Sequence, residues 1–355
     1  MKRIGLALSG GGIRAAIFHL GVLCGLAEAG QFGKIASISS VSGASLCIGL
    51  IFAANGNKWP DGGTFLKKIL PRAKELILEE NIQRAALRRL PFAPHKWNHR
   101  VLMLADMLEK KWGIAGDLQD LPQFPFWEIN CTTFETGGRF RFRRDYMGDE
   151  KIGYVQRPKF PISHMIAASA AFPVLIGPYV LKTDGLSFSR AKRGVDSAGA
   201  VSEANVSRVG EDMCRNLRVP STPDAASHNE KAALRRKYSL WDGGVYDNLG
   251  LDALHKIGRG LDGEIDFLIV SNAGAPLDFA THGRPSKNLR RLLDISSAQV
   301  DRLRTRDFLA SVVRKGHGLY LRISENYPTT LNSPSQADFD RIFRDGRESV
   351  RAVQD

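Results

Sequence analysis

The stretch "IGLALSGGGIRAA", Ile4–Ala16, places three consecutive glycines between two apolar segments. Residues 3–8 have the apolar run of a short buried strand, and residues 13–29 have the mostly apolar pattern of a helix that ends at a glycine. Residues 35–40 predict a second strand, and residues 44–54 predict a second helix. This early order of strand, helix, strand and helix favours a parallel sheet with right-handed crossovers, so we predict an α/β fold.

The chain has 355 residues, of which 43% are hydrophobic, enough for one large α/β domain or two small ones. No apolar run reaches the about 20 residues that a membrane-spanning helix needs, so we expect a soluble protein. The N-terminal residues imitate the zones of a signal peptide, but Arg14 and His19 interrupt the apolar zone. We therefore expect a cytoplasmic protein, with peripheral attachment to the inner face of the membrane as a further option.

Four cysteines, Cys24, Cys47, Cys131 and Cys214, are scattered without a C-x-x-C pair or a histidine at ligand spacing. This pattern supports neither a disulfide framework nor a zinc site. Buried, reduced thiols are the expectation for a cytoplasmic protein. The sequence therefore predicts no metal ion.

The formal net charge is +13, and it is unevenly distributed. Ten Lys and Arg residues lie between Arg284 and Arg322 against three Asp residues, and RFRFRR at 139–144 forms a second basic run. Such an excess attracts polyanions, either nucleic acid or the anionic head groups of a membrane. Neither run has the motif of a nucleic-acid module, so no nucleic acid is expected, and ordinary solvated faces are the alternative interpretation.

The remaining segments predict a single domain over residues 1–355. Residues 64–112 look helical and basic, and we predict a helical insertion or cap there. Residues 184–230 are rich in small and polar residues with little periodicity, which predicts a long mobile surface loop. The C-terminal third looks helical and charged. Strand-like runs are found at four places: residues 126–133, 139–143, 238–241 and 265–271.

The glycine loop follows a strand and opens a helix, the usual place of a phosphate-binding turn. The Walker pattern fails because no Gly-Lys-Ser/Thr follows. Gly10, Gly12 and Ala15 meet the dinucleotide pattern, but that fingerprint needs an acidic residue after the second strand, where the sequence is SSVS at 39–42. Free N–H groups at a helix N-terminus also suit the oxyanion of acyl transfer. Arg14 opposes the helix dipole, so we predict that it faces an anion.

Ser42 lies in SVSGAS, residues 40–45, between the second strand and the second helix. This is the context of a nucleophile elbow, which presents a serine hydroxyl on a strained turn. Ser40 and Ala44 replace the glycines usual in that pattern, and a serine-rich helix N-cap explains the stretch about as well. Because loops at the carboxyl ends of adjacent parallel strands converge, we expect the glycine loop and Ser42 to lie side by side. Together they would form an acyl-transfer site.

Asp242 is the preferred proton acceptor for the serine hydroxyl. It ends a strand in SLWDGGVYDNLGL and precedes Gly243-Gly244, which permit close backbone approach. An Asp-Gly hairpin turn is the alternative interpretation, and Asp247 is a second candidate base. The histidines available to a triad fall in helical or basic segments: His255, His282 and His317.

These residues together resemble the patatin-like phospholipase family, in its bacterial branch. The resemblance implies a mainly parallel central sheet flanked by helices, and a Ser–Asp dyad without histidine or cofactor. Carried over by position, Ser42 is the nucleophile and Asp242 the general base. The N–H groups of Gly10, Gly11 and Gly12 supply the oxyanion hole, supported by Arg14. The matching blocks cover most of residues 1–255: 9–14, 40–45, 132–149 (TTFETGGRFRFRRDYMGD), 167–178 (AASAAFPVLIGP) and 242–244.

The resemblance implies a serine lipid acyl hydrolase that cleaves carboxylic esters of membrane lipids, as a phospholipase A or a lysophospholipase does. Its expected partners are a membrane phospholipid or other lipid ester and an anionic membrane surface. We expect residues 44–54 and part of 64–112 to line the acyl pocket. The substituted positions Ser40 and Ala44 leave open a catalytically weakened lipid- or phosphate-binding protein, and the glycine pattern leaves open a nucleotide-binding module. The sequence does not give the oligomeric state.

Overall fold

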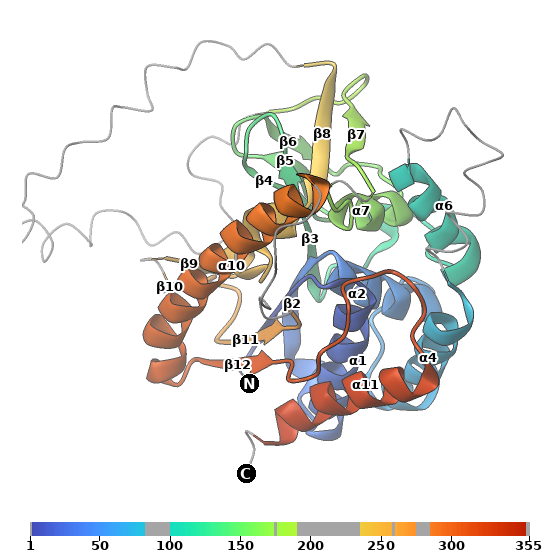
Figure 1. The fold of residues 1–355 in the computed structure, drawn as a ribbon, viewed down its shortest axis with the longest axis vertical. Coiled ribbons are helices and arrows are strands. Elements are labelled where there is room, and N and C mark those ends of the chain that lie inside the picture. Colours follow the sequence, from blue (N-terminus) through green and yellow to red (C-terminus); the bar gives the residue numbers. More distant parts are fainter. Residues whose placement is uncertain are drawn as a thin grey trace, which may run out of the picture.

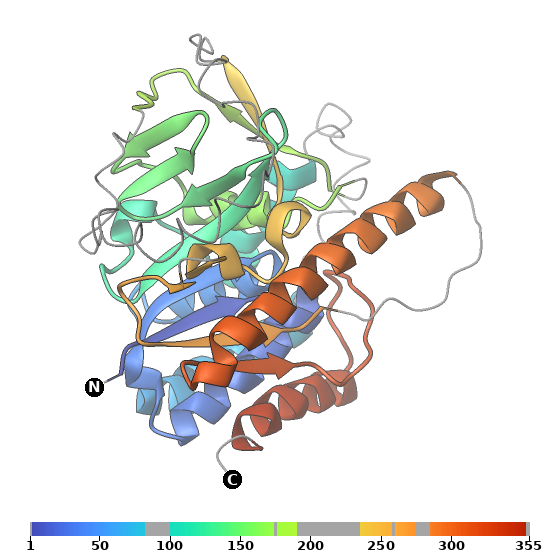
Figure 2. The same ribbon diagram turned by 90° about the vertical axis from the view of Figure 1, so that its left-hand side faces the viewer.

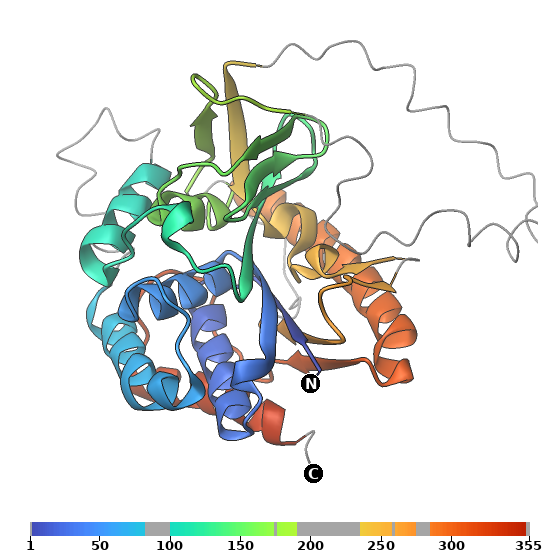
Figure 3. The same ribbon diagram turned by 180° about the vertical axis from the view of Figure 1, so that it is seen from behind.

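The computed structural model describes residues 2–81, 100–173, 176–189, 235–257, 260–274 and 285–352. Within these residues a large mixed sheet runs through the molecule, and helices cover both of its faces (Figures 1 and 3). The fold class predicted from the sequence is confirmed.

The sheet has a parallel half and an antiparallel half. Its parallel half has the strand order β12-β11-β1-β2-β3, and β4, β5 and β6 continue it as an antiparallel meander. A further strand, β8, pairs antiparallel with β3 and β7, and β9 and β10 form a separate small sheet. The strands are β1 (Ile4–Leu8), β2 (Ile35–Val41), β3 (Phe126–Thr133), β4 (Arg139–Phe142), β5 (Tyr146–Asp149), β6 (Gly153–Gln156), β7 (Tyr179–Lys182), β8 (Lys237–Asp242), β9 (His255–Lys256), β10 (Gly260–Leu261), β11 (Phe267–Asn272) and β12 (Gly318–Arg322).

Most of the helices lie on one face of the sheet, and α10 lies on the other (Figure 3). The α-helices are α1 (Gly12–Glu28), α2 (Gly43–Ala54), α3 (Gly62–Thr64), α4 (Leu70–Glu79), α6 (Arg100–Trp112), α7 (Ile162–Ser169), α9 (Gly244–Asp247), α10 (Pro285–Ser311) and α11 (Gln336–Arg351). The shorter turns are η1 (Phe32–Lys34), η2 (Phe65–Ile69, a π-helix), η5 (Leu118–Asp120), η7 (Leu251–Ala253) and η8 (Val313–Lys315).

The side chains of β1 point alternately to the two faces of the sheet, and both faces are covered by helices. Leu6 and Leu8 point into the larger hydrophobic cluster, which contains most of α1 and α2. Ala7 points the other way, into a smaller cluster that includes Phe308 of α10. Because successive side chains of a strand point to opposite faces, a strand buried on both sides reads as the continuous apolar run seen at residues 3–8.

The C-terminal helix α11 packs closely against α1. Glycines make this approach possible: a Cβ built on Gly346 would lie 2.2 Å from the Phe18 carbonyl oxygen, and one built on Gly21 would lie 2.2 Å from the Phe343 carbonyl oxygen. The last hundred residues, which match the family blocks least clearly, are therefore joined to the N-terminal half of the domain (Figure 2).

The strands and helices predicted for the first 54 residues are all present, as are the four later strands. The C-terminal third differs from prediction, because it also contains the strand β12 and an irregular segment over residues 323–335, which we call the strap. Within residues 64–112, residues 64–79 and 100–112 are helical, residues 80–81 are not, and residues 82–99 lie outside the described residues. Most of the predicted loop at 184–230 also lies outside them.

The second basic run does not form a free cationic face. Arg139 is 7% exposed and pairs with Glu128 at 2.7 Å. The Arg143 guanidinium lies 4.2 Å from the centre of the Phe126 ring. Ion pairs or aromatic rings within the domain surround the guanidinium groups of three of its four arginines, Arg139, Arg141 and Arg143.

Cys24, Cys47 and Cys131 are free and buried, as predicted, and Cys214 lies outside the described residues. No cluster of His, Cys, Asp or Glu side chains in the described part of the chain has the arrangement of a metal site. None of the helices that the structure describes combines the length and apolar character needed to cross a bilayer.

Candidate active site

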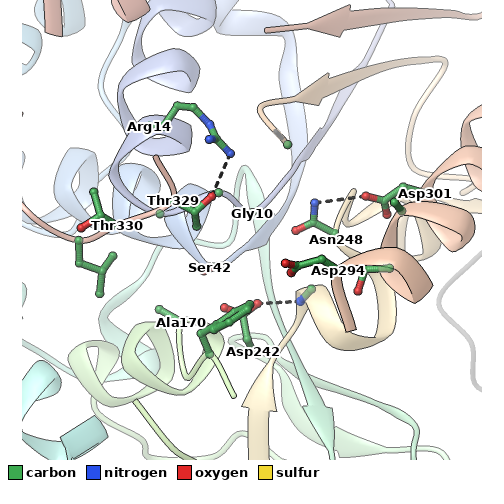
Figure 4. A pocket seen from close by; sticks show the side chains of 18 of the residues that line it. Gly10, Arg14, Ser42, Ala170, Asp242, Asn248, Asp294, Asp301, Thr329 and Thr330 are labelled. Atoms are coloured by element: carbon green, nitrogen blue, oxygen red, sulfur yellow. Dashed lines mark hydrogen bonds between the residues drawn. The ribbon is translucent and has the colours of Figure 1, made fainter. Parts of the chain in front are cut away.

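Two strands meet end to end at the candidate site. β2 ends at Val41, which pairs with Asn130 of β3, and β8 ends at Asp242, which pairs with Cys131. Because β4 occupies the other edge of β3, β2 and β8 share one edge and run toward each other. This topology brings Ser42 next to Asp242, although the two residues are far apart in the sequence (Figure 4).

Ser42 stands on a strained turn between β2 and α2. Its backbone has a φ of 52° and a ψ of −115°, and a positive φ is uncommon for a residue other than glycine. The Ser42 side chain makes no capping hydrogen bond to α2, so the helix N-cap interpretation does not account for it. Its hydroxyl instead faces the cavity that it shares with the Asp242 carboxyl group, and it lowers the pKa of that group. A strained turn with its serine off the helix is the backbone arrangement of a nucleophile elbow.

A chain of buried hydroxyl groups holds this turn from below. The Ser42 N–H donates to Ser169 Oγ at 2.9 Å, and Ser169 Oγ donates to the Asn130 carbonyl oxygen at 2.8 Å. Ser45 Oγ lies 3.0 Å from Ser169 Oγ and 2.9 Å from Ser40 Oγ. Ser40, which replaces an elbow glycine, therefore takes part in the network that fixes the elbow. Sequence reasoning did not identify Ser169.

The glycine loop lies directly beside the elbow. Gly11 and Gly12 have φ values of 145° and 64°, which L side chains rarely adopt. A Cβ built on Gly43 would lie 2.0 Å from the Gly12 carbonyl oxygen, so the two loops touch through bare backbone. The Gly10 N–H donates to the Asn248 carbonyl oxygen at 3.0 Å. Gly10 is therefore not the free donor that the sequence predicted, because the chain itself occupies its N–H.

Asp242 is buried at the end of β8 and is 4% exposed. Burial raises the pKa of its carboxyl group to about 6, and the hydrogen bond from the Gly244 N–H, at 2.8 Å, and the neighbouring Ser42 hydroxyl offset part of this effect. The chain continues from Gly243 into the helix α9 rather than into a second strand of a hairpin. The hairpin-turn interpretation of this stretch is therefore wrong.

Arg14 is 1% exposed, and its donors bind oxygen atoms of the protein. Nε donates to the Ala273 carbonyl oxygen at 2.9 Å, and the terminal nitrogens donate to the Tyr327 carbonyl oxygen and, at 3.3 Å, to Thr329 Oγ1. Burial lowers the pKa of the guanidinium to about 10. In place of the predicted anion, Arg14 faces neutral oxygens of the strap and of the segment after β11, and it ties both to the glycine loop.

The strap crosses the mouth of the glycine loop. The Thr330 carbonyl oxygen accepts a hydrogen bond from the Ile13 N–H at 2.8 Å. Near its start, the strap is fixed to α11 because the Ser324 N–H and hydroxyl both donate to the Asp345 carboxylate at 2.8 Å. No sequence motif marks these contacts, since most of them use backbone groups.

A cavity of about 350 Å³ opens over Ser42 and Asp242. Figure 4 shows Arg14 and the strap on one side of it and the carboxylates of α10 on the other. Residues 44–54, which were expected to line an acyl pocket, are mostly buried in the core and do not reach it. Its other lining residues are Gly10–Gly12, Ala170, Phe172, Ile176, Gly244, Asn248, Gly274, Arg291, Asp294, Ser297, Ala298, Asp301 and 329–331.

The wall formed by α10 carries carboxyl groups that the sequence did not assign to the site. Asn248 Nδ2 donates to Asp301 Oδ2 at 3.4 Å. Burial, and then the like charge of Asp247, raise the pKa of Asp301 to about 7. Asp294 lies beside it on the same face of the helix (Figure 4). The one sequence signal for these carboxyl groups is that Asp294 and Asp301 are seven positions apart in an otherwise basic helix.

The alternative bases lie elsewhere. Asp247 accepts hydrogen bonds from the Leu249 and Asp252 N–H groups at 3.2 and 2.7 Å, and it does not line the cavity. His255 lies 3.2 Å from Ser311 Oγ, away from Ser42. His317 lines a separate hollow beside β10, and His282 lies outside the described residues. Within the described residues, Asp242 is therefore the only predicted base that lines the cavity together with Ser42.

Comparison with known proteins agrees with this architecture. The model of the patatin-like phospholipase family matches residues 6–255. Among curated proteins, none matches the chain.

Solved structures show a similar fold at low sequence identity. Human GIVD cytosolic phospholipase A2 in complex with methyl gamma-linolenyl fluorophosphonate has a TM-score of 0.51 and 15% identity, over 99% of this chain and 58% of that one. The same human protein with terbium chloride gives a TM-score of 0.50 and 11% identity, with the same coverage of both chains. VipD from Legionella pneumophila gives 0.42 and 16%, over 99% of this chain and 67% of that one. The chain thus spans just over half the length of the human structures, and at these identities the likeness concerns the fold.

Proposed function

The chain belongs to the patatin-like phospholipase family, and on that premise we propose that it is a serine acyl hydrolase that cleaves carboxylic esters of membrane lipids. The observation that carries the proposal is the placement of Ser42, on its strained turn, in one cavity with the buried carboxyl group of Asp242. Membership of the family and the likeness to phospholipase structures support a lipid ester hydrolase in general terms. The assignment of a Ser–Asp dyad is our own.

In the first step, Ser42 Oγ attacks the ester carbonyl carbon while Asp242 accepts the hydroxyl proton. The tetrahedral intermediate then collapses, the bond to the alcohol breaks, and Asp242 returns the proton to the leaving oxygen. Water attacks the acyl-enzyme through the same base, which releases the fatty acid and restores the Ser42 hydroxyl. A pKa near 6 suits these roles, because the carboxyl group is mostly ionised at neutral pH but is more basic than an exposed aspartate.

The oxyanion donors are the N–H groups of Gly11 and Gly12, for which the described residues provide no acceptor. Each such donor contributes about 2.7–4 kcal/mol of transition-state stabilisation in acyl transfer. Arg14 acts through the backbone, because its contacts hold the glycine loop against the strap. Because its donors are already bound to oxygen atoms of the protein, Arg14 is a positioning residue.

A fluorophosphonate probe tests the nucleophile, because it phosphonylates an activated serine. We expect Ser42→Ala to abolish labelling while circular dichroism shows an unchanged fold. Ser311→Ala is the matched control, since Ser311 is the serine that lies 3.2 Å from His255, and it should label as the wild type does. Loss of labelling in Ser311→Ala, with labelling kept in Ser42→Ala, would reject the dyad.

A lipid panel read by mass spectrometry tests the substrate class. Wild-type protein should release free fatty acid from at least one phospholipid, lysophospholipid or neutral lipid ester, and Ser42→Ala should release none. Bound lipid without any hydrolysis would instead assign the chain to the weakened binding proteins that the substitutions at Ser40 and Ala44 leave open.

A further inference from the structure

Helix α10 has one face on the catalytic cavity. Asp294, Ser297, Ala298 and Asp301 all line that cavity, and their spacing places them along one side of the helix. The helix runs along the outside of the domain (Figures 1 and 2). Its opposite side is therefore turned away from the protein.

That outer side carries four exposed large apolar side chains, together with the exposed Ser296 and Gln299. Leu292 and Leu303 are 62% and 64% exposed, and Ile295 and Val300 are each 38% exposed. At 100° per residue, Leu292 and Leu303 fall about 20° apart around the helix axis, with the other two flanking them. These four residues are four of the ten large hydrophobic side chains found exposed in the described part of the chain, and the other six are spread over several elements.

The pattern inverts what a surface helix normally shows. A helix on a globular protein turns its apolar stripe to the core and its charged residues to water. Here carboxylates face the cavity while leucines face outward, at a cost of about 25 cal/mol for each Å² of apolar surface left in water. Four large apolar side chains exposed on one side of a single helix indicate an interaction site.

The charged residues on this outer side favour an anionic partner. Arg302 and Arg306 are exposed beside Leu303. The three acidic residues of the helix lie off this side, because Asp294 and Asp301 line the cavity and Asp307 lies 3.7 Å from His255 Nδ1. Leucines flanked by arginines match an anionic lipid surface. A second copy packed on the same side would place its own arginines near these, which is unfavourable.

We propose that the outer side of α10, formed by Leu292, Ile295, Val300, Arg302, Leu303 and Arg306, docks on an anionic lipid bilayer. The apolar side chains enter the boundary between head groups and acyl chains, and the arginines pair with anionic head groups. Because the same helix forms a wall of the cavity, docking holds that cavity about one helix diameter, 10–12 Å, from the lipid surface. This docking role extends the proposed lipid hydrolysis and rests on it for its purpose.

Vesicle sedimentation tests the docking surface directly. We expect wild-type protein to bind phosphatidylcholine vesicles that contain phosphatidylglycerol far better than pure phosphatidylcholine vesicles. The pair Arg302→Gln and Arg306→Gln should weaken that binding about 25-fold at low salt, since each arginine near an anionic surface contributes about a factor of five. The pair Leu292→Gln and Leu303→Gln should weaken it by about tenfold or more.

Leu102→Gln is the matched control, because Leu102 is a 39%-exposed leucine on the helix α6. It should bind vesicles as the wild type does. None of the α10 variants should change hydrolysis of a soluble short-chain ester, whereas the double variants should hydrolyse vesicle lipid more slowly. Unchanged vesicle binding in both double variants would overturn the proposal, as would a dimer in light scattering that the leucine variants dissociate.

The two proposals fail separately. If wild-type protein binds vesicles through α10 but hydrolyses no ester, the proposed catalysis is wrong and the docking surface stands. If it hydrolyses vesicle lipid and the double variants bind and hydrolyse as well as the wild type, the docking surface is wrong and the catalysis stands.

Discussion

Asp242 combines deep burial with contact to the proposed nucleophile, and its raised pKa has a consequence for activity. A general base must be ionised, so kcat/KM should fall about tenfold for each pH unit below about pH 6. An exposed aspartate would place this limb near pH 4. The profile can be measured between pH 4.5 and 8.5 with a soluble ester.

Asp301 provides the check on this assignment, because its pKa is raised to about 7 in the same cavity. In Asp301→Asn the limb should stay near pH 6, whatever happens to the absolute rate. If the acidic limb of the pH profile disappeared in this variant, the group that titrates would be Asp301 rather than Asp242.

Ser169 holds the elbow through a single hydroxyl group, and Ser169→Ala would leave the Ser42 N–H buried without an acceptor. Such a loss costs about 1–3 kcal/mol and lets the turn shift. We expect kcat to fall about 10- to 100-fold with little change in KM, because the nucleophile moves while the cavity keeps its shape. Ser163→Ala, a buried serine on the same helix, is the control. Equal effects in the two variants would contradict a positioning role.

The sequence predicted the two dyad residues and the glycine loop, but not Ser169, the carboxyl groups of α10 or the contacts that the strap makes. The positions of Ser42 and Asp242 follow from strand ends and turn glycines. The hydrogen bond from the Gly10 N–H to the Asn248 carbonyl oxygen depends on the position of the chain after α9. The hydrogen bond from Arg14 to the Tyr327 carbonyl oxygen depends on the position of the strap. A positive charge in the first turn of a helix indicates a buried acceptor, but the sequence does not distinguish an anion from carbonyl groups.

The contact between the glycine loop and α2 is a matter of whole elements. Gly43→Ala would place a Cβ 2.0 Å from the Gly12 carbonyl oxygen, so the helix and the loop must separate. We expect a loss of about 1–3 kcal/mol in the free energy of unfolding, together with a loss of esterase activity. Gly33→Ala is the control, since nothing lies within 4 Å of its Cβ position. Urea unfolding and a soluble ester measure both effects, and a fully active Gly43→Ala would reject this contact as part of the site.

At the scale of elements, local periodicity predicted the β1, α1, β2 and α2 succession because each of these elements is buried along its whole length. The antiparallel direction of β8 was not predictable. The local sequence pattern of a strand is the same whether it pairs with β3 in the parallel or in the antiparallel direction. β12 was missed because it is a short edge strand of five residues that is only partly buried.

At the scale of the whole molecule, the catalytic loops depend on the C-terminal helix. The strap runs from β12 to α11, is fixed to α11 through Asp345, and reaches the glycine loop through Arg14 and Ile13. Any displacement of α11 from α1 should therefore move the strap, although both helices lie on the far side of the core from α10. Stability and activity are coupled through this connection.

Gly346→Ala tests the coupling, because its Cβ would lie 2.2 Å from the Phe18 carbonyl oxygen and would force the two helices apart. We expect Tm to fall and the esterase rate to fall several-fold at 20 °C, where the protein is still folded, because the strap loses its register on the glycine loop. Ser349→Ala, on the same helix, should change neither quantity. A lower Tm with full activity would show that α11 stabilises the domain without positioning the site.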